Sequence, residues 1–151
     1  MQTGVDTAGS VWIEDCGRVR GAGGVLSCRM FEVGIEGAQG FVVDGPLLTD
    51  VRGTLPFSVL STPGMISMME WAATSLVSPL LEEGQATVGF EICIKHVAGA
   101  QQGARCTARA RLEEVVDRRK LRFAVEVVDG NGRTIGVGTH ERRIVAGVGA
   151  V

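Results

Sequence analysis

The second half of the chain alternates between apolar and polar residues with a period of two, which is typical of strands that bury one face. Four such segments follow Gly84, at residues 86–95, 104–116, 119–128 and 133–145. In the third segment one side carries Leu121, Phe123, Val125 and Val127, and the other carries Lys120, Arg122 and Glu126. The Asp-Gly-Asn-Gly run at residues 129–132 favours positive φ and predicts a tight hairpin. The pattern therefore predicts long antiparallel strands with one dry face and one wet face.

A single long helix is predicted over residues 62–83. Thr62 before Pro63 is a start signal, because threonine caps free N–H groups and proline suits the first turn. Gly84 is a stop signal. Apolar residues occupy both sides of the helix: Met65, Met68, Met69, Ala72, Leu76 and Leu80 on one, and Ile66, Trp71, Ala73, Val77 and Leu81 on the other. A helix that is apolar nearly all round is expected to be buried.

The start of the chain is patterned differently. Residues 1–29 are rich in glycine, and the Gly21–Gly24 run lacks the strand, helix and spacing of a dinucleotide-binding loop. We therefore expect a flexible extension at residues 1–29 and one domain at residues 30–151. Phe41–Val43 predicts a short strand in this domain. A central buried helix wrapped by a long antiparallel sheet is the α+β arrangement called the hot-dog fold, which we predict here.

Composition narrows the possible partners. The chain has 151 residues, with 15 basic and 17 acidic side chains and a net charge of −2. One domain of this length is expected, and the absence of clustered positive charge argues against nucleic acid and anionic membranes. The first thirty residues do not resemble a signal peptide, and no apolar stretch reaches about 18 residues. We therefore expect a cytoplasmic protein with free thiols.

The cysteines and histidines do not predict a metal site. The four cysteines form no C-x-x-C pair, and only two histidines, His96 and His140, are present. These residues cannot assemble a zinc-binding spacing, so no metal is expected. Cys93 lies an odd number of residues before His96, which places the two on opposite faces of a strand. We interpret Cys93 as a core residue.

Candidate chemistry centres on Glu70, which lies in the middle of the apolar helix. A buried carboxylate is costly unless it is hydrogen-bonded, paired or functional. Thr62 lies eight residues earlier, about 80° around the helix, so both side chains can border one pocket. With His96 at the end of a strand, they would supply a hydroxyl, a carboxylate and an imidazole. Such a set can activate the hydroxyl or a water for attack on an acyl carbon.

Each of these residues also has a simpler interpretation. Thr62 can cap the helix without any catalytic role, and local sequence favours this interpretation. A histidine at a strand end is often a surface or packing residue. Glu70 can be paired structurally with an arginine such as Arg142.

Three stretches together carry a resemblance to a known family. They are STPGMISMMEWA at residues 61–72, GFEICIKH at residues 89–96 and GVGTHER at residues 136–142. They resemble the fluoroacetyl-CoA-specific thioesterases, a family of hot-dog proteins, and the likeness runs from about Phe31 to Val145. The Met-Glu-Trp-Ala and Gly-Thr-His-Glu-Arg elements, at matching separations, are its specific part.

The resemblance implies a role for each matched residue. Thr62, Glu70 and His96 fall on the family's catalytic set, Gly89 on the glycine whose amide holds the thioester carbonyl, and Arg142 on a substrate-binding arginine. A backbone N–H at Gly89 would stabilise the developing oxyanion. The resemblance thus implies hydrolysis of a short acyl-CoA thioester without a cofactor.

One departure concerns the choice of acyl group. The family's phenylalanine gate lies six residues before its catalytic threonine, and that position is Pro56 here, with Phe57 next to it. We take Phe57 as the candidate substrate-binding residue. The resemblance therefore implies hydrolysis of a short acyl-CoA thioester, but it does not imply selectivity for a fluorinated acyl group.

The spacing of the site residues predicts an assembly. Gly89 and His96 are seven residues apart on one predicted strand, which separates them by about 23 Å on opposite faces. Either the strand bends sharply, or each site takes Gly89 from one subunit and His96 from the other. We predict a homodimer with its sites at the subunit interface.

Two other functions fit the same scaffold, because a fold does not fix a reaction. One is a hot-dog protein that binds acyl-CoA or another small molecule without turnover. The other is a hydratase that acts on an enoyl thioester.

Overall fold

The computed structural model describes residues 3–5, 11–13 and 31–146. The first two ranges are short strands, β1 (Thr3–Val5) and β2 (Val11–Ile13), which pair antiparallel. The remainder of the predicted extension at residues 1–29 lies outside the described residues. Its expected flexibility stays a prediction.

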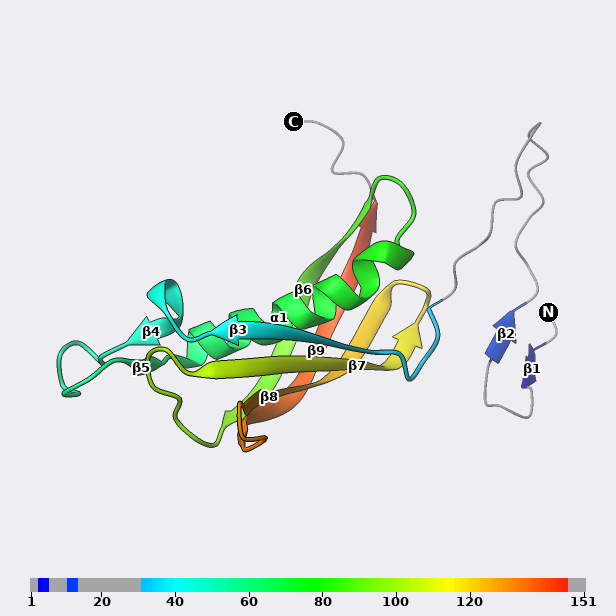
Figure 1. Cartoon of the computed structure of the whole chain (residues 1–151). Coiled ribbons are helices and arrows are strands. Elements are labelled where there is room, and N and C mark those ends of the chain that lie inside the picture. Colours follow the sequence, from blue (N-terminus) through cyan, green and yellow to red (C-terminus); the bar gives the residue numbers. More distant parts are fainter. Residues whose placement is uncertain (1–2, 6–10, 14–30, 147–151) are drawn as a thin grey trace.

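A five-stranded antiparallel sheet forms the main layer, in the spatial order β3-β7-β8-β9-β6 (Figure 1). Its strands are β3 (Glu36–Val42), β6 (Gln85–His96), β7 (Arg105–Val116), β8 (Lys120–Asp129) and β9 (Thr134–Ala146). The last four lie within one residue of the four predicted segments at each end, so alternation located them correctly. β3 begins earlier than the predicted strand at Phe41–Val43, because its small, weakly patterned residues pair with β7 along their whole length.

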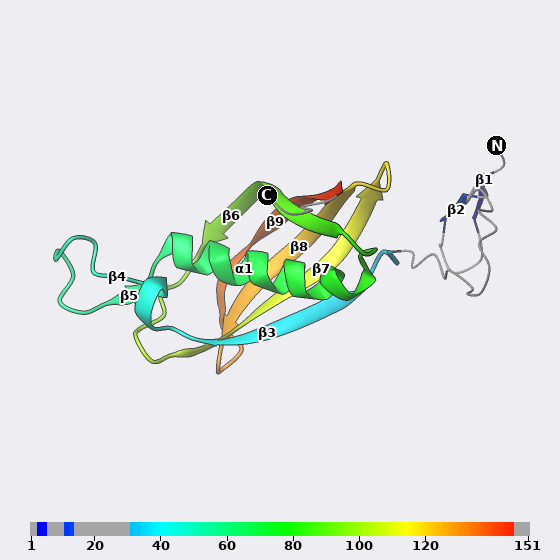
Figure 2. The same ribbon diagram turned by 90° about the horizontal axis from the view of Figure 1, so that it is seen from above.

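The helix α1 (Thr62–Val77) lies across one face of the sheet (Figure 2). It ends earlier than predicted and continues as a single 3₁₀ turn, η2 (Ser78–Leu80). Pro79 accounts for the early end, since proline has no N–H to donate and clashes with the preceding turn. Among the described residues, no helix is long and apolar enough to cross a membrane.

Burial of the helix is one-sided in the single chain. Its buried side chains are Met65, Met68, Met69, Ala72, Ala73 and Val77. Trp71, by contrast, is 60% exposed, so the expectation of a helix buried all round is wrong for the single chain. The sheet covers only the face that carries the methionines and alanines.

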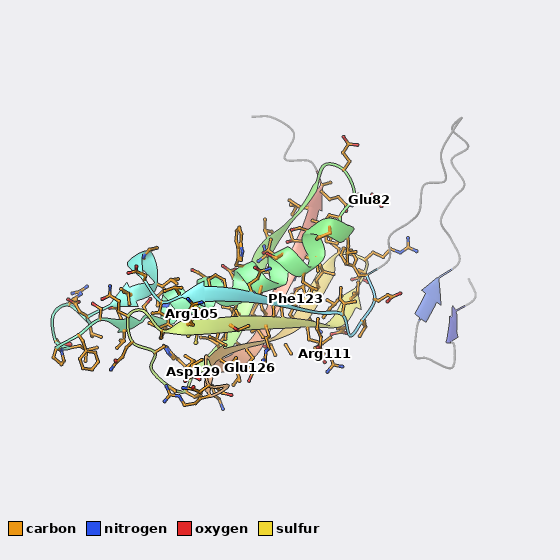
Figure 3. The ribbon with its side chains drawn as sticks, viewed as in Figure 1. Glu82, Arg105, Arg111, Phe123, Glu126 and Asp129 are labelled. Carbon is orange, nitrogen blue, oxygen red and sulfur yellow. The ribbon has the colours of Figure 1, made fainter. Side chains whose placement is uncertain are left out.

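The two faces of the sheet differ as the alternation predicted. Leu121, Phe123 and Val127 are buried beneath the helix. On the other face Arg109 pairs with Glu126 at 3.6 Å, and the side chains of Arg111 and Glu126 point away from the helix (Figure 3). Such exposed ion pairs contribute little stability, so the apolar layer between helix and sheet holds the fold.

A short hairpin precedes the helix. The 3₁₀ turn η1 (Gly45–Leu47) leads into β4 (Leu48–Thr49), which pairs with β5 (Val59–Leu60). The loop between these strands projects beyond the end of the sheet (Figures 1 and 2). Phe57 lies on this loop and is 52% exposed.

Candidate active site

The first turn of α1 is capped by Ser61 rather than by Thr62. The Ser61 Oγ accepts a hydrogen bond from the Gly64 N–H at 2.9 Å, which is the bond expected of an N-cap residue. The interpretation of Thr62 as the cap is therefore wrong. Thr62 is the first helical residue, and its hydroxyl is not needed to cap the helix.

The Thr62 hydroxyl contacts His96 instead. Its Oγ1 lies 3.0 Å from Nδ1 of His96, the last residue of β6. A tight fit between helix and sheet makes this contact possible. Gly136 is the register partner of His96 on β9, and a Cβ on Gly136 would collide with the Met65 side chain. The absence of a side chain at Gly136 thus lets the first turn of the helix settle next to His96.

The hydrogen bond to Thr62 indicates which ring nitrogen of His96 carries the proton. When the Thr62 O–H donates to Nδ1, a neutral imidazole carries its proton on Nε2. That Nε2 atom is buried and has no hydrogen-bond partner within the described part of the chain. A buried polar atom without a partner costs about 1–3 kcal/mol, so this nitrogen is suited to binding a group from outside the single chain.

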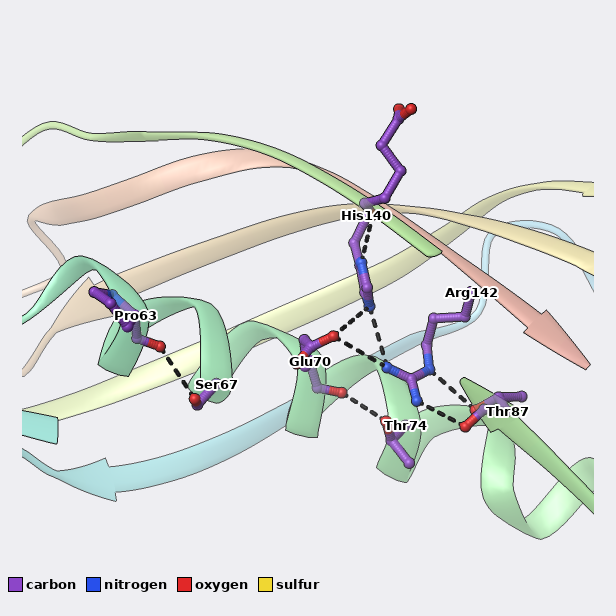
Figure 4. Close-up of polar contacts among 8 residues, drawn as sticks. Pro63, Ser67, Glu70, Thr74, Thr87, His140 and Arg142 are labelled. Carbon is purple, nitrogen blue, oxygen red and sulfur yellow. Dashed lines mark hydrogen bonds and ion pairs between the residues drawn. The ribbon is translucent and has the colours of Figure 1, made fainter. Parts of the chain in front are cut away.

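A second polar group lies further along the helix. Glu70 Oε1 is 3.7 Å from His140 Nε2 and 3.8 Å from Arg142 Nη1 (Figure 4). Both partners come from β9, and both are buried. The structure therefore supports the simpler interpretation that Glu70 faces Arg142. It also adds His140, which sequence reasoning named as an imidazole but did not place in a site.

Gly89 completes this group on the neighbouring strand. A Cβ at this position would collide with Glu70 Oε1 and would lie 3.5 Å from His140 Cε1. The Glu70 carboxylate therefore rests directly on the backbone of β6, in space that only a glycine leaves free. We call Thr62 and His96 the Thr62 pair, and Glu70, Gly89, His140 and Arg142 the Glu70 cluster.

The Glu70 carboxylate is not enclosed, which corrects the expectation of a buried acid. Its side chain is 42% exposed and faces a surface pocket of about 500 Å³. Residues of α1, β6 and β9 line this pocket: Ser67, Glu70, Trp71, Thr74, Thr87, Val88, Gly89 and Arg142. Thr62 and His96 are not among them.

Arg142 is held by neutral acceptors. Its Nε donates to Thr87 Oγ1 at 3.0 Å, its Nη2 to the Thr87 carbonyl at 2.9 Å, and its Nη1 lies 3.2 Å from His140 Nε2 (Figure 4). Burial lowers the pKa of Arg142, while Glu70 raises it. Sequence reasoning missed Thr87, which precedes Gly89 by two residues and so faces the same way.

The protonation of His140 follows from its contacts. Nδ1 lies 2.8 Å from the Glu91 carbonyl oxygen, which can only accept, so Nδ1 carries a proton. Burial lowers the pKa of His140 below its ordinary value, and the Arg142 charge lowers it further. The Glu91 carbonyl and Glu70 act in the opposite direction.

The Thr62 pair and the Glu70 cluster lie at opposite ends of the same sheet face. Gly89 pairs with Arg142 and His96 pairs with Gly136, and the register of β6 on β9 shifts between Gly89 and Glu91. This bulge absorbs Phe90. The prediction that Gly89 and His96 lie on opposite faces of the strand is therefore wrong. The extra residue in the bulge shifts the alternation by one, so both residues lie on the same face. Their separation is retained at about 20 Å, since six residues of extended β9 lie between their partners.

The remaining candidates lie apart from both groups. Cys93 is exposed on β6, so its interpretation as a core residue is wrong. The outward face of an edge strand is open to solvent in a single chain. Phe57 and Pro56 are exposed on the β4–β5 loop. Within residues 31–146 and the two short strands, no group of three His, Cys, Asp or Glu residues is placed to hold a metal ion.

A single helix laid across a five-stranded antiparallel sheet defines a protein of the hot-dog class. The chain belongs to the fluoroacetyl-CoA-specific thioesterase family, whose model matches residues 47–147. It is 39% identical over 87 residues to the fluoroacetyl-CoA thioesterase of Streptantibioticus cattleyicolor. That stretch covers 58% of this chain and 61% of the relative, so the chain spans less than two thirds of the relative's length.

Solved structures agree with this assignment. A structure of the fluoroacetyl-CoA thioesterase FlK superimposes with a TM-score of 0.70 and 31% identity, covering 78% of this chain and 90% of that one. A thioesterase superfamily member from Thermus thermophilus gives a TM-score of 0.71 and 29% identity, covering 78% and 86%. The predicted hot-dog fold and the resemblance inferred from the three sequence stretches are both confirmed.

Proposed function

We propose that this protein hydrolyses a short acyl-CoA thioester and that each active site combines the Thr62 pair of one subunit with the Glu70 cluster of another. The observation that carries the proposal is the separation of the two groups. They share one face of the sheet, yet lie about 20 Å apart along β9, which is more than a small acyl group spans. Each group is incomplete alone.

The edge of the sheet supports pairing of two copies. β6 is a twelve-residue strand at the edge of the sheet. Among the described residues it pairs only with β9, so the backbone groups of its other side are available to a partner. Val88, Phe90 and Val97 are exposed on and just beyond this strand. An exposed, apolar edge of this length favours pairing with another strand. A two-fold axis near the middle of β6 would place His96 of each copy near Gly89 of its mate.

The proposed chemistry assigns a task to each group. His96 accepts a proton from the attacking group, which is either the Thr62 hydroxyl or a water in its place. The attack forms a C–O bond at the acyl carbon, and the C–S bond breaks as His96 returns the proton to the departing CoA sulfur. Where Thr62 is the attacking group, a water activated by His96 then cleaves the acyl-threonine to release the free acid. The backbone at Gly89 donates to the thioester carbonyl as it becomes an oxyanion. Glu70 orients the attacking group, and Arg142 contributes positive charge beside the reacting carbonyl.

Two further parts of the proposal concern substrate and location. Phe57, on the projecting β4–β5 loop, contacts the acyl or pantetheine portion of the substrate. The thiols of Cys93 and Cys106 are free, consistent with a reducing compartment, and we place the enzyme in the cytoplasm.

Subunit mixing tests the composite site. Neither His96→Ala nor Glu70→Gln alone is expected to be active. A heterodimer of the two variants would hold one intact site, so a random mixture should regain about a quarter of wild-type activity. Mixing two batches of the same variant is the matched control. Failure to recover activity in heterodimers isolated with two different affinity tags would refute the composite site.

Thiol release from a panel of short, branched, aromatic and halogenated acyl-CoAs tests the reaction. Turnover that is lost in His96→Ala supports hydrolysis. Binding without turnover would instead favour a non-catalytic acyl-CoA-binding protein, and hydration of an enoyl-CoA would favour a hydratase. Rapid quenching with a labelled acyl-CoA separates the two routes, because label on Thr62 marks an acyl-enzyme and its absence marks direct attack by water.

A further inference from the structure

His140 is a buried imidazole that the proposed reaction does not use, and its contacts give it a specific task. We propose that His140 is a positioning residue that holds the Arg142 guanidinium away from the Glu70 carboxylate, so that this carboxylate stays free to bind the attacking group. This inference rests on the proposed function for its catalytic consequence. Its structural content stands on the contacts alone.

The hydrogen bonds of His140 define one protonation state. Nδ1 donates to the Glu91 carbonyl at 2.8 Å, and Nε2 lies 3.2 Å from Arg142 Nη1, which can only donate. Nε2 must therefore accept and carry no proton. A doubly protonated imidazole would bring two N–H groups face to face at Arg142. The pKa of His140, which burial lowers, agrees with this neutral form.

The neutral imidazole changes the meaning of its approach to Glu70. An unprotonated Nε2 at 3.7 Å from Glu70 Oε1 is not an ion pair, because it brings no charge and no proton to the carboxylate. The only charge that faces Glu70 in this cluster is that of Arg142, and their closest atoms are 3.8 Å apart. This distance is too long for a hydrogen bond.

Neutral acceptors explain why Arg142 does not close on Glu70. A guanidinium beside a carboxylate normally forms a short, bidentate pair. Here Thr87 takes the Nε and Nη2 donors, and His140 takes Nη1. The positive charge therefore stays next to Glu70, while the carboxylate keeps its lone pairs for groups in the pocket. Without the His140 acceptor, Nη1 would be free to turn to Glu70 and occupy it.

Two substitutions separate the two hydrogen bonds of His140. His140→Asn retains an amide N–H near the Nδ1 position, which can donate to the Glu91 carbonyl, but it has no acceptor that reaches Arg142. His140→Gln places a carbonyl oxygen near the Nε2 position, which can accept from Arg142. We expect kcat to fall about tenfold in His140→Asn with KM within about twofold, and to recover in part in His140→Gln.

A merely structural role predicts a different result. Both variants would then show wild-type kcat per folded molecule and only a lower melting temperature. That outcome would refute the proposal, as would equal kcat losses in the two variants, because loss of the Arg142 acceptor could not then be the cause.

Nitrogen NMR of the imidazoles tests the same idea without any turnover. The chain has only two histidines, so the His96→Ala variant leaves the His140 signals alone. We expect a protonated Nδ1 and an unprotonated Nε2 at pH 7. A proton on Nε2 would overturn the proposal whether or not the protein is a thioesterase. If the predicted tautomer is present but no acyl-CoA is hydrolysed, the proposed function fails and the arrangement of His140 and Arg142 stands.

Discussion

The two ends of the face between helix and sheet carry polar groups of opposite character. In the Glu70 cluster the guanidinium of Arg142 and the imidazole of His140 have partners within the chain, supplied by Thr87, Glu91 and one another. In the Thr62 pair a single hydrogen bond joins the two side chains, and Nε2 of His96 has no partner among the described residues. Arg142 and His140 thus have their hydrogen bonds at one end, whereas Nε2 of His96 at the other end has none among the described residues.

This difference indicates how the work of a site is divided. The hydrogen bonds of Arg142 and His140 hold these two side chains in place before substrate arrives, which suits stabilisation of developing charge. A pair with an unused nitrogen suits proton transfer, since it retains capacity to bind a new group. Substitutions at each end of this face test that division.

His96→Ala should have the largest effect, because it removes the proton acceptor itself. We expect kcat to fall by about three orders of magnitude, with the melting temperature little changed. Steady-state thiol release and thermal unfolding measure the two quantities. Retention of more than about a tenth of wild-type kcat would show that proton transfer occurs elsewhere.

Gly89→Ala should come next, because a Cβ there collides with Glu70 Oε1 and displaces the carboxylate. We expect kcat to fall about 100-fold. Gly99→Ala is the matched control, since a Cβ at Gly99 meets nothing within 4 Å. Equal activities of the two variants would mean that the position of Glu70 does not matter.

Thr87→Val should have a moderate effect, because it removes one of the three acceptors of Arg142 and leaves the Thr87 carbonyl in place. We expect catalytic efficiency to fall by about a factor of five. Thr107→Val, a half-buried threonine on β7, serves as the comparison variant. An unchanged kcat/KM in Thr87→Val would remove this hydrogen bond from the site.

Stability should depend on pH through His140. Its pKa is lowered in the folded state relative to about 6.5 in an unfolded chain, so the unfolded state binds the extra proton first as pH falls. The contribution of His140 to the free energy of unfolding should therefore be fully present above about pH 6.5. It should be lost as pH falls through the folded-state pKa. The charged groups that face His140, Glu70 and Arg142, are present in both the wild type and the His140→Asn variant, so the difference between the two proteins reports on His140. Urea titrations should show a shallower decrease in His140→Asn, and parallel curves would contradict this assignment.

Phe57→Ala should have the smallest effect, because Phe57 is 52% exposed on the β4–β5 loop. We expect KM to rise about two- to threefold, with unchanged kcat and melting temperature. Isothermal titration with CoA and an unreactive acyl-CoA analogue would separate the acyl contact from the CoA contact. Wild-type KM for every acyl-CoA tested would place Phe57 outside the substrate site.

Alternation and local signals predicted the strands and the start of the helix, because both depend on neighbouring residues. The same local signals failed at Thr62 and Cys93. Two adjacent hydroxyl residues, Ser61 and Thr62, can each cap a helix, and only the folded backbone selects one. The odd spacing from His96 places Cys93 on the opposite face of β6, but only the structure shows that this face is the exposed one.

The sequence suggested Glu70, Gly89 and Arg142 as candidate site residues, but it did not place His140 or Thr87 with them. His140 and Arg142 are two residues apart and share a face, so their proximity could have been inferred from the strand pattern. Thr87 could have been added by the same spacing from Gly89. Their contact with Glu70 required the position of the helix on the sheet, which depends on the packing of Met65 against Gly136.

The amino-acid sequence was enough to infer the family, the strand positions and the chemical types of the candidate residues, because periodicity and short motifs are properties of contiguous residues. Tertiary structure alone decided that Gly89 and His96 face the same way, since one bulge residue at Phe90 reverses a parity that sequence counting had assumed. It also decided that Glu70 belongs with Arg142 and His140 rather than with Thr62. Two turns of helix separate Glu70 from Thr62 by about 12 Å, and the sheet supplies different partners at each end.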